Sequence, residues 1–300
     1  MASILVESTE AVSNVLLKGQ REGDLPLLPT LLLNHTEGFY DATTLAGLTK
    51  PVSCISVVAA DFDNDMDVDM YLSCRSGVQN ISNILYENNG NSTFTTHADG
   101  AGAAGVLWVS VTDGAGAAES AVTADYDNDG FLDLFVTNGL NLRPHILGGP
   151  HQLFHNIGNA NNWIQLELHG TTSNRSGVGA KVYAMSGGAT QLREQNGGYH
   201  RYSQNQKRLH FGLAKHTTVD LRVEWPSGNL DFYTKVAVNK FYDITEQGDI
   251  LETNPVYEKP SPCGYPDYDS AVDSGFFIWK DCNTGEWKVR VMSGGGPTKK

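Results

Sequence analysis

The sequence is poor in cysteine and in positive charge, and it lacks any long apolar run. It has four cysteines, and its formal net charge is −13, with 21 Lys and Arg residues against 34 Asp and Glu residues. A chain this acidic lacks the basic face that nucleic-acid binding requires, so we expect no nucleic-acid partner. No stretch reaches the roughly 18 apolar residues of a membrane-spanning helix, so we expect no transmembrane segment.

Motifs of catalysis and of secretion are missing as well. The chain has no nucleophile elbow, no HExxH and no kinase signature. The glycines of residues 177–179, close to Arg175, resemble a phosphate loop, but no P-loop Lys-Ser/Thr follows them. The first residues have neither a basic region nor a long apolar core, so we predict that they are not a signal peptide. The sequence therefore predicts no catalytic residue and favours a protein that is not an enzyme.

Histidines are the remaining candidates for chemistry. His145, His151 and His155 lie close together in the sequence, which is compatible either with a metal site or with the polar residues of a loop. His210 alternates with two apolar residues, so its side chain is expected on the opposite strand face from theirs. This position indicates a packed or surface histidine in preference to a general base.

Two acidic loops, residues 61–69 and 125–133, are the most informative feature of the chain. Each has carboxylates at relative positions 1, 3, 5 and 9, and each lies between two apolar, strand-like runs. With Asp67 added, the two loops contain nine carboxylates, and without them the net charge would be −4, so most of the acidity is local. So much negative charge at one turn repels itself unless a cation lies within it, and oxygen ligands on a flexible loop suit Ca²⁺ before Mg²⁺. The sequence predicts two Ca²⁺ sites.

The predicted ligands are the side chains of the loop carboxylates and the backbone carbonyl at position 7. They are Asp61, Asp63, Asp65, Asp67 and Asp69 in the first loop, and Asp125, Asp127, Asp129, Phe131 and Asp133 in the second. An EF-hand is excluded, because it needs a bidentate Glu at position 12 and flanking helices. Gly130 at position 6 suits a sharp turn with positive φ, whereas Met66 is expected to strain or change that turn. We therefore expect the second site to be better formed.

The cysteines are spaced for disulfides. Cys54 and Cys74 are equidistant from the centre of the first loop, so they can face each other across a hairpin. Glu119 and Asn138 are assigned to the corresponding places of the second loop, so the bridge would be particular to the first. The alternative is that all the cysteines are buried free thiols. Disulfides would indicate an oxidising, extracellular setting.

The C-terminal part contains the other two cysteines, Cys263 and Cys282, which bracket the start of a predicted second hairpin and could also pair. Four sequons permit N-glycosylation without arguing for it: Asn34, Asn80, Asn91 and Asn174.

Several stretches resemble known families. "FYDATTLAGL", "VVAADFDNDMDVDMYLSC" and "NILYENNGNSTF" resemble the FG-GAP (VCBS-type) repeat, which forms the blades of integrin-α-like β-propellers. "NNWIQLELHGTTSNRSGVGAKV" and "SQNQKRLHFGLAKHTTVDLRVEWPSG" are similar to the ASPIC/UnbV domain, which follows such repeats in the cartilage-acidic-protein family. An L-x-x-N frame recurs at Leu31, Leu85 and Leu153, with a blade-sized period.

Short runs of alternating apolar and polar residues predict half-buried antiparallel strands at residues 163–168, 181–184, 209–211 and 219–225, and a further strand is predicted at residues 106–111. We therefore expect an all-β chain in four parts. These are a leader or exchanged strand (residues 1–30), partial β-propeller-like calcium-binding repeats (31–160), a β-sandwich-like ASPIC/UnbV domain (161–250), and a linker with a disulfide-pinned hairpin and a tail (251–300). Propellers close with about 4 to 8 blades, and this chain has too few. The leader, the ASPIC/UnbV domain or a neighbouring copy could cover the open faces, and we favour self-association into an oligomer or filament.

The leading functional hypothesis is a secreted, calcium-stabilised structural or adhesive protein of the extracellular matrix or of a surface assembly, with a glycan or an extracellular protein as its ligand. One alternative is an enzyme or enzyme subunit built on a propeller, such as a lyase or a natural-product biosynthetic enzyme. The other is a carbohydrate-binding module that uses aromatic side chains: Trp108, Trp163, Trp225, Trp279, Trp287, Tyr199 and Tyr202.

Overall fold

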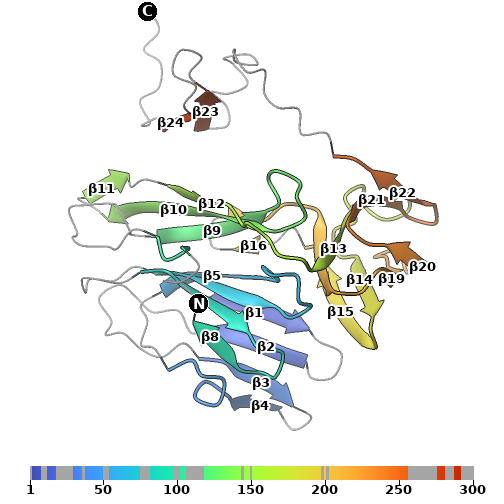
Figure 1. Cartoon of the computed structure of the whole chain (residues 1–300), viewed down its shortest axis with the longest axis horizontal. Coiled ribbons are helices and arrows are strands. Elements are labelled where there is room, and N and C mark those ends of the chain that lie inside the picture. Colours follow the sequence, from blue (N-terminus) through green and yellow to red (C-terminus); the bar gives the residue numbers. More distant parts are fainter. Residues whose placement is uncertain are drawn as a thin grey trace, which may run out of the picture. The chain divides into compact units, whose positions relative to one another are not determined.

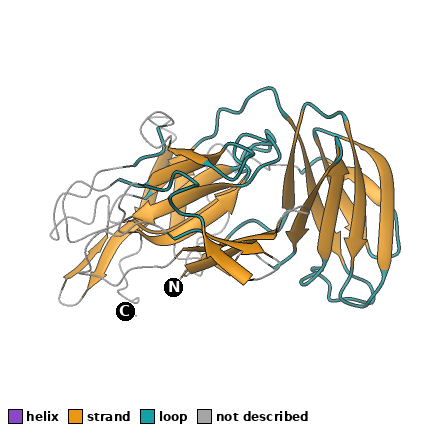
Figure 2. Ribbon diagram, turned by 90° about the horizontal axis from the view of Figure 1, so that it is seen from below, coloured by secondary structure: helices purple, strands orange, loops and turns teal. Residues whose placement is uncertain are grey.

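The structure is a computed structural model. It describes residues 2–7, 12–17, 30–35, 38–49, 54–74, 82–96, 102–105, 118–142, 145–148, 151–196, 199–200, 203–255, 276–280 and 287–291. The chain divides into two units, Met1–Asn254 and Pro255–Lys300. All regular elements among the described residues are strands, as Figure 2 shows. Accordingly, no helix in this part of the chain is long and apolar enough to cross a membrane.

The first half of unit 1 is built from small antiparallel sheets that follow one another along the chain (Figure 1). A two-stranded sheet of β3 (Leu32–His35) and β4 (Gly38–Asp41) comes first. The second sheet runs in the order β5 (Cys54–Ala60), β6 (Asp69–Cys74), β7 (Ile84–Asn88) and β8 (Phe94–Thr96). In the third, β10 (Asp133–Leu142) pairs with β9 (Ala118–Ala124), β11 (His145–Gly148) and β12 (Gln152–Phe154).

The second of these sheets is buried on both faces. Every residue of β6 is buried, which is the pattern of a strand covered on both sides and not of one that faces water. On one face, Met70 and Leu72 join a cluster with Leu31 and Leu48. On the other, the neighbouring residue Tyr71 packs with apolar residues of β9 and β10. The sheets therefore stack through two separate hydrophobic layers, one on each side of β5 to β8.

The second half of unit 1 contains two four-stranded sheets. One has the order β18 (Leu209–Ala214), β13 (Asn162–His169), β21 (Lys240–Thr245) and β22 (Ile250–Thr253). The other has the order β15 (Ala189–Glu194), β14 (Lys181–Ser186), β19 (Thr218–Glu224) and β20 (Leu230–Ala237). Alternate residues of β14 and β19 are buried, as expected for strands with one face against a core.

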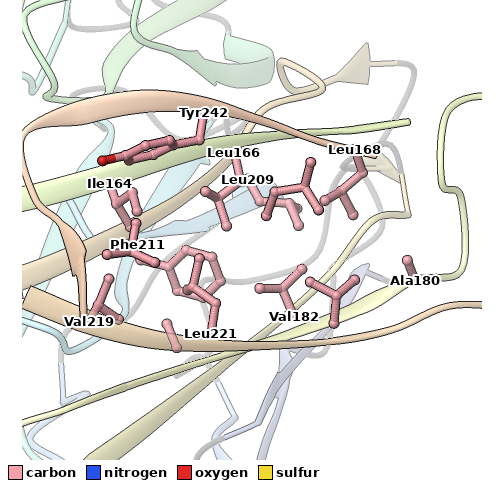
Figure 3. Close-up of a cluster of buried hydrophobic side chains, with 14 of the residues drawn as sticks. Ile164, Leu166, Leu168, Ala180, Val182, Leu209, Phe211, Val219, Leu221 and Tyr242 are labelled. Carbon is pink, nitrogen blue, oxygen red and sulfur yellow. The ribbon is translucent and has the colours of Figure 1, made fainter. Parts of the chain in front are cut away.

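Both sheets contribute to one hydrophobic core. Ile164, Leu166 and Phe211 come from the first sheet, and Val182 and Leu221 come from the second. Figure 3 shows these side chains pointing toward one another between the strands. The alternating runs predicted for residues 163–168, 181–184, 209–211 and 219–225 are all strands, but their expected antiparallel arrangement is only partly right, because β13 and β21 are parallel.

The predicted disulfide of the first hairpin is confirmed. Cys54 and Cys74 are register partners on β5 and β6, and they are disulfide-bonded. The place assigned to Glu119 in the second hairpin was wrong: Asn138 pairs with Ala118, and Glu119 lies in the register shift beside it. The first hairpin has the matching irregularity between Cys54 and Ser56. The bridge is thus particular to the first hairpin, as expected.

The leader forms its own hairpin, because β1 (Ala2–Glu7) pairs antiparallel with β2 (Val12–Leu17). Short strands β16 (Tyr199–His200) and β17 (Ser203–Gln204) also pair. In unit 2, β23 (Phe276–Lys280) and β24 (Trp287–Val291) form the predicted C-terminal hairpin. Cys263 and Cys282 lie outside the described residues, as does the strand expected near residues 106–111.

Candidate cation-binding site

The two acidic loops have the same backbone. Each closes a hairpin, between β5 and β6 in the first case and between β9 and β10 in the second. At position 4, Asn64 and Asn128 have φ values of 59° and 61°. At position 6, Met66 and Gly130 have φ values of 89° and 93°. Met66 therefore does not change the turn. It adopts the same left-handed conformation as glycine, which is strained for a residue with a side chain.

The carboxylate at position 1 organises each loop in the same way. Asp61 accepts hydrogen bonds from the N–H groups of Asp65 (3.1 Å) and Met66 (3.0 Å). Asp125 accepts the equivalent bonds from Asp129 (3.1 Å) and Gly130 (3.0 Å). The loop sequence therefore bends its own backbone around the first carboxylate.

The closing carboxylate at position 9 also acts identically in both loops. Asp69 accepts a hydrogen bond from the N–H of Phe62 (2.9 Å), and Asp133 accepts one from the N–H of Tyr126 (3.0 Å). These bonds return the end of each loop to its beginning. As a result, ligand atoms of the aspartates at positions 1, 3 and 9 lie within 4.8 Å of one another in both loops.

The residues at positions 5 and 7 are not part of this group of aspartates at positions 1, 3 and 9. Asp65 and Asp129 each accept the N–H of position 7, at 2.9 Å. The structure gathers Asp129 into a group with Asp127 and His155, whereas Asp65 and Asp67 are in no group of three candidate ligands among the described residues. The donor set at the centre of each loop is all oxygen, which is the chemistry that fits a hard cation such as Ca²⁺.

Each loop contains buried carboxyl groups that are costly to ionise in the absence of a cation. Burial raises the pKa of Asp61 to about 8, although Arg193 opposes the shift and Asp65 and Asp63 reinforce it. Burial likewise raises the pKa of Asp69 to about 8 and that of Asp125 to about 6, in spite of hydrogen bonds from backbone N–H groups. Buried, mutually repelling carboxylates are stabilised as anions when a divalent cation lies among them.

Two asparagines that were not predicted as site residues support the closing carboxylates. The N–H of Asn88 donates to Asp69 and that of Asn156 donates to Asp133, both at 2.8 Å. Their side-chain amides donate to the carbonyl oxygens of Val68 and Leu132, both at 3.2 Å. Asn88 and Asn156 are the last residues of the L-x-x-N frame. That recurring frame was the signal in the sequence, because it preserves the residue that holds position 9.

The residue before each asparagine distinguishes the loops. It is Glu87 in the first repeat and His155 in the second. The Nδ1 atom of His155 lies 3.2 Å from a carboxylate oxygen of Asp133 and 3.6 Å from one of Asp127. His151 has a different partner, since its Nδ1 accepts the N–H of Asn138 (3.2 Å). His155 is thus a polar neighbour of the second loop, and the side chain of His145 lies outside the described residues.

Both loops rest on the first sheet of the following segment. The N–H of Ala214 donates to the carbonyl oxygen of Asn64 (2.8 Å), and the Gln165 amide donates to Asp125 (2.5 Å). A Cβ atom on Gly212 would lie 2.1 Å from the Oδ2 atom of Asp61, so the loop can lie on β18 only because that residue is glycine. Alternation along the strand could not reveal this close approach.

Charged and aromatic residues complete the contact. Arg208 donates to the Asn128 side chain (2.9 Å) and lies over the ring of Phe241, 4.9 Å from its centroid. His210 is buried, as a packed histidine was expected to be, and its Nε2 atom lies 3.2 Å from the carbonyl oxygen of Gly130. Burial lowers the pKa of His210 to about 4, so it is neutral near pH 7. A neutral ring can donate from Nε2 to that carbonyl.

The remaining predicted positions lie away from the loops. Arg175 and residues 177–179 form a turn, in which the N–H of Gly177 donates to the carbonyl oxygen of Asn174 (2.9 Å). Of the sequons, Asn91 is exposed between β7 and β8, and Asn174 is exposed in the same turn as Arg175. The side chain of Asn34 and the whole of Asn80 lie outside the described residues.

A buried carboxylate that sequence reasoning missed fastens three loops of this segment. Glu246 accepts hydrogen bonds from the N–H groups of Thr171, Thr172 and Ser173, at 2.6–2.9 Å. It also accepts one from the Asn229 amide (3.0 Å) and one from the Ser227 hydroxyl. Burial alone would raise the pKa of Glu246, but these hydrogen bonds outweigh it and hold the pKa well below its ordinary value.

Comparison with known proteins identifies part of the chain. Residues 170–250 match the model of the ASPIC and UnbV family. The chain is 32% identical over 220 residues to cartilage acidic protein 1 of Xenopus tropicalis, covering 68% of this chain and 30% of that protein. It is 28% identical over 189 residues to cartilage acidic protein 1 of Mus musculus (61% of this chain, 27% of that protein) and of Homo sapiens (61% and 26%).

The matches cover only a part of each related protein. The chain spans 30% or less of the length of these curated relatives. The predicted resemblance to the ASPIC/UnbV domain is confirmed, and the similarity to cartilage acidic protein 1 supports the predicted family. The chain thus contains an ASPIC and UnbV domain at residues 170–250 and is similar, over about two thirds of its own length, to cartilage acidic protein 1.

Proposed function

We propose that this chain is part of a secreted, calcium-binding structural protein, in which two Ca²⁺ ions fix propeller-like FG-GAP repeats against the ASPIC and UnbV domain. The observation that carries the proposal is the repetition of one geometry. Both loops bring the carboxylates of positions 1, 3 and 9 together within 4.8 Å, with the same hydrogen bonds to the backbone. Two copies of one arrangement in one chain argue for a common ligand.

The chemistry of the loops supports calcium as that ligand. Asp61, Asp63 and Asp69 would hold the first ion, and Asp125, Asp127 and Asp133 would hold the second. A bound divalent cation would offset the repulsion of the buried carboxylates and stabilise the hairpins. Folding and calcium binding would then be linked, because the unfolded chain has no preformed site.

An extracellular location is supported by two observations. The Cys54–Cys74 disulfide is typical of proteins that fold in an oxidising compartment. The similar proteins are named for cartilage, a tissue rich in extracellular matrix. Weak calcium sites on loops are filled at the millimolar calcium concentration outside cells. A role in a matrix or surface assembly follows as part of the proposal.

The described residues give less support to the two alternatives, an enzyme and a carbohydrate-binding module. Trp163 and Trp225 are buried, at 7% and 4% exposure, so their rings are not available to stack on a sugar. His151 and His155 have separate partners and do not converge on one point.

Self-association remains a prediction. Segment 203–206 covers the edge of β9 through bonds such as that from the Gln206 N–H to Thr123, and it already protects one open edge of the repeats.

Thermal unfolding of the full chain with millimolar Ca²⁺ and with excess chelator tests the proposal. Each site contributes about 2.7 kcal/mol at a calcium concentration of 100 Kd, so two sites should shift Tm by about 10 °C or more. The double variant Asp63→Ala, Asp127→Ala removes one ligand side chain from each site and should unfold like the chelated protein whether or not calcium is present. The control Asp243→Ala changes a partly exposed acid outside the loops and should respond like the wild type. An identical melting curve with and without chelator would refute the proposal.

Sedimentation velocity with and without chelator tests the assembly part separately. Assemblies that dissolve on chelation would show that calcium-ordered sheets complete one another between copies. A monomer in both conditions would restrict the role of calcium to a single chain.

A further inference from the structure

The two loops contact each other as well as the sheet beneath them. The side-chain amide of Asn64, at position 4 of the first loop, donates to the carbonyl oxygen of Gly130 (3.1 Å), at position 6 of the second. Asn64 is completely buried. The N–H of Gly130 donates to Asp125, the first carboxylate of its own loop. The conformation of the second loop around Asp125 is therefore tied directly to a side chain of the first.

A second connection joins the closing carboxylates. The N–H of Asn156 donates to Asp133 (2.8 Å), and its side-chain amide donates to the carbonyl oxygen of Phe62 (2.7 Å). The N–H of Phe62 in turn donates to Asp69 (2.9 Å). A continuous path of hydrogen bonds thus runs from the closing carboxylate of the second loop, through Asn156 and Phe62, to that of the first.

The corresponding residues of the other repeat make no such cross-connection. Asn88 matches Asn156, but its amide donates within its own loop, to Val68. Asn128 matches Asn64, but its side-chain oxygen accepts from Arg208 on the neighbouring sheet. The connection between the loops therefore depends on specific amides and does not follow from the repeat itself. Asn159 and Asn161, which follow Asn156, also donate from their side chains to the carbonyl oxygen of Asp63 in the first loop (2.6 and 2.8 Å).

We propose that the two cation sites are coupled, so that an ion in one loop raises the affinity of the other loop for its ion. This inference rests on the proposed function. An ion that gathers the carboxylates of the first loop also fixes Phe62 and Asn64, and these residues hold Asn156 and Gly130 in the positions that the second loop needs. The second ion then binds a loop that is already ordered, so the free-energy cost of ordering the loops falls mainly on the first ion.

Isothermal titration of Ca²⁺ into the full chain tests the coupling, with Asn64→Gly as the decisive variant. Glycine retains the left-handed backbone at φ 59° and removes only the amide. In the wild type, loss of one site through Asp127→Ala should weaken calcium binding at the other site by about 5-fold or more, since allosteric couplings are typically of that size. In the Asn64→Gly background the same substitution should weaken the remaining site by a smaller factor, because the connection through Asn156 is still present. Asn128→Gly, the matched control, should retain the coupling.

A second pair of variants covers the case in which Asn64→Gly does not fold, as judged by circular dichroism. Asn156→Ala removes the amide that reaches the first loop but leaves its N–H on Asp133, and Asn88→Ala removes the equivalent amide that stays within one loop. Asn156→Ala should reduce the coupling, and Asn88→Ala should not. Two calcium ions that bind independently in the wild type would overturn the coupling alone. Absence of calcium binding in the wild type would overturn the proposed function with it.

Discussion

The first and second acidic loops have one backbone in two different settings. Their position-4 and position-6 φ angles agree within a few degrees, and their first carboxylates accept hydrogen bonds from the same two positions. Burial raises the pKa of Asp61 to about 8 but that of Asp125 only to about 6, where a hydrogen bond from the Gln165 amide opposes the shift. Nine residues suffice to specify the shape of the site, whereas its electrostatics come from the protein around it.

The settings also differ in what stabilises them. The first loop has a disulfide across its hairpin and a strained methionine at position 6. The second has no disulfide but has a glycine at position 6, with the ring of Trp163 against it. The expectation that the second site is better formed is not borne out by the backbone, since both loops have the same turn. The difference lies in how that turn is held.

The largest effect is expected from exchanging the position-6 residues. In Gly130→Met, a Cβ atom would lie 1.7 Å from Cε2 of Trp163, on a backbone with φ of 93°. We expect a loss of about 3 kcal/mol or more in the free energy of unfolding, from overpacking and backbone strain. The reverse change, Met66→Gly, should stabilise the chain by about 1 kcal/mol by relieving the left-handed methionine. Urea denaturation measures both, and equal effects would contradict the assigned roles.

Removal of the disulfide should rank next. The double variant Cys54→Ala, Cys74→Ala frees a loop of about 20 residues, which should cost about 3 kcal/mol in urea denaturation. The complementary variant, Ala118→Cys with Asn138→Cys, installs a bridge at the matching register pair of the second hairpin. It should stabilise by a smaller amount, because engineered bridges distort native geometry. Loss of calcium binding at the second loop on removing the first bridge would instead indicate a role beyond the first hairpin.

The number of protons released when calcium binds should test the electrostatic difference between the two loops. With pKa values of about 8 for Asp61 and Asp69, the calcium-free first loop holds protons at pH 7, and calcium must displace them. The second loop, with Asp125 at about 6, should release fewer. Calcium titration of the Asp127→Ala and Asp63→Ala variants in buffers of different ionisation enthalpy measures each loop alone. Equal release from both loops would contradict this difference in pKa between Asp61 and Asp125.

The same shifts set the pH dependence of stability. Since the folded pKa values of Asp61 and Asp69 are raised above the ordinary 3.8, their contribution to stability is present below that value and is lost as the pH rises through about 8. Calcium-free protein should therefore lose stability from about pH 4 to pH 8, and the stabilisation by calcium should grow over that range. A calcium effect on Tm that does not change with pH would argue against buried carboxylates as its source.

Local patterns made much of this fold predictable. Alternation of apolar and polar residues located the strands around Val182 and Leu221, and the symmetry of Cys54 and Cys74 about the first loop predicted their pairing. Both are short-range features, for which sequence distance fixes spatial distance. The repeated spacing of aspartates predicted for the same reason that positions 1, 3 and 9 meet, although positions 5 and 7, which the prediction also included, lie outside these groups of three.

Contacts between segments that are distant in the sequence could not be predicted from these short-range features. Alternation is the same for parallel and antiparallel neighbours, so the parallel pairing of β13 with β21 left no sign in the sequence. The need for glycine at Gly212 arises from a loop about 150 residues earlier, which no local rule could supply. Glu246 had no distinguishing pattern either, because its donors come from two other loops.

The most direct test of the account is the calcium content of the full chain after equilibrium dialysis, measured by atomic emission. The account predicts two ions per wild-type chain, one in Asp63→Ala and one in Asp127→Ala, since alanine removes the ligand oxygens. A wild-type chain without bound calcium, or variants that retain both ions, would contradict it.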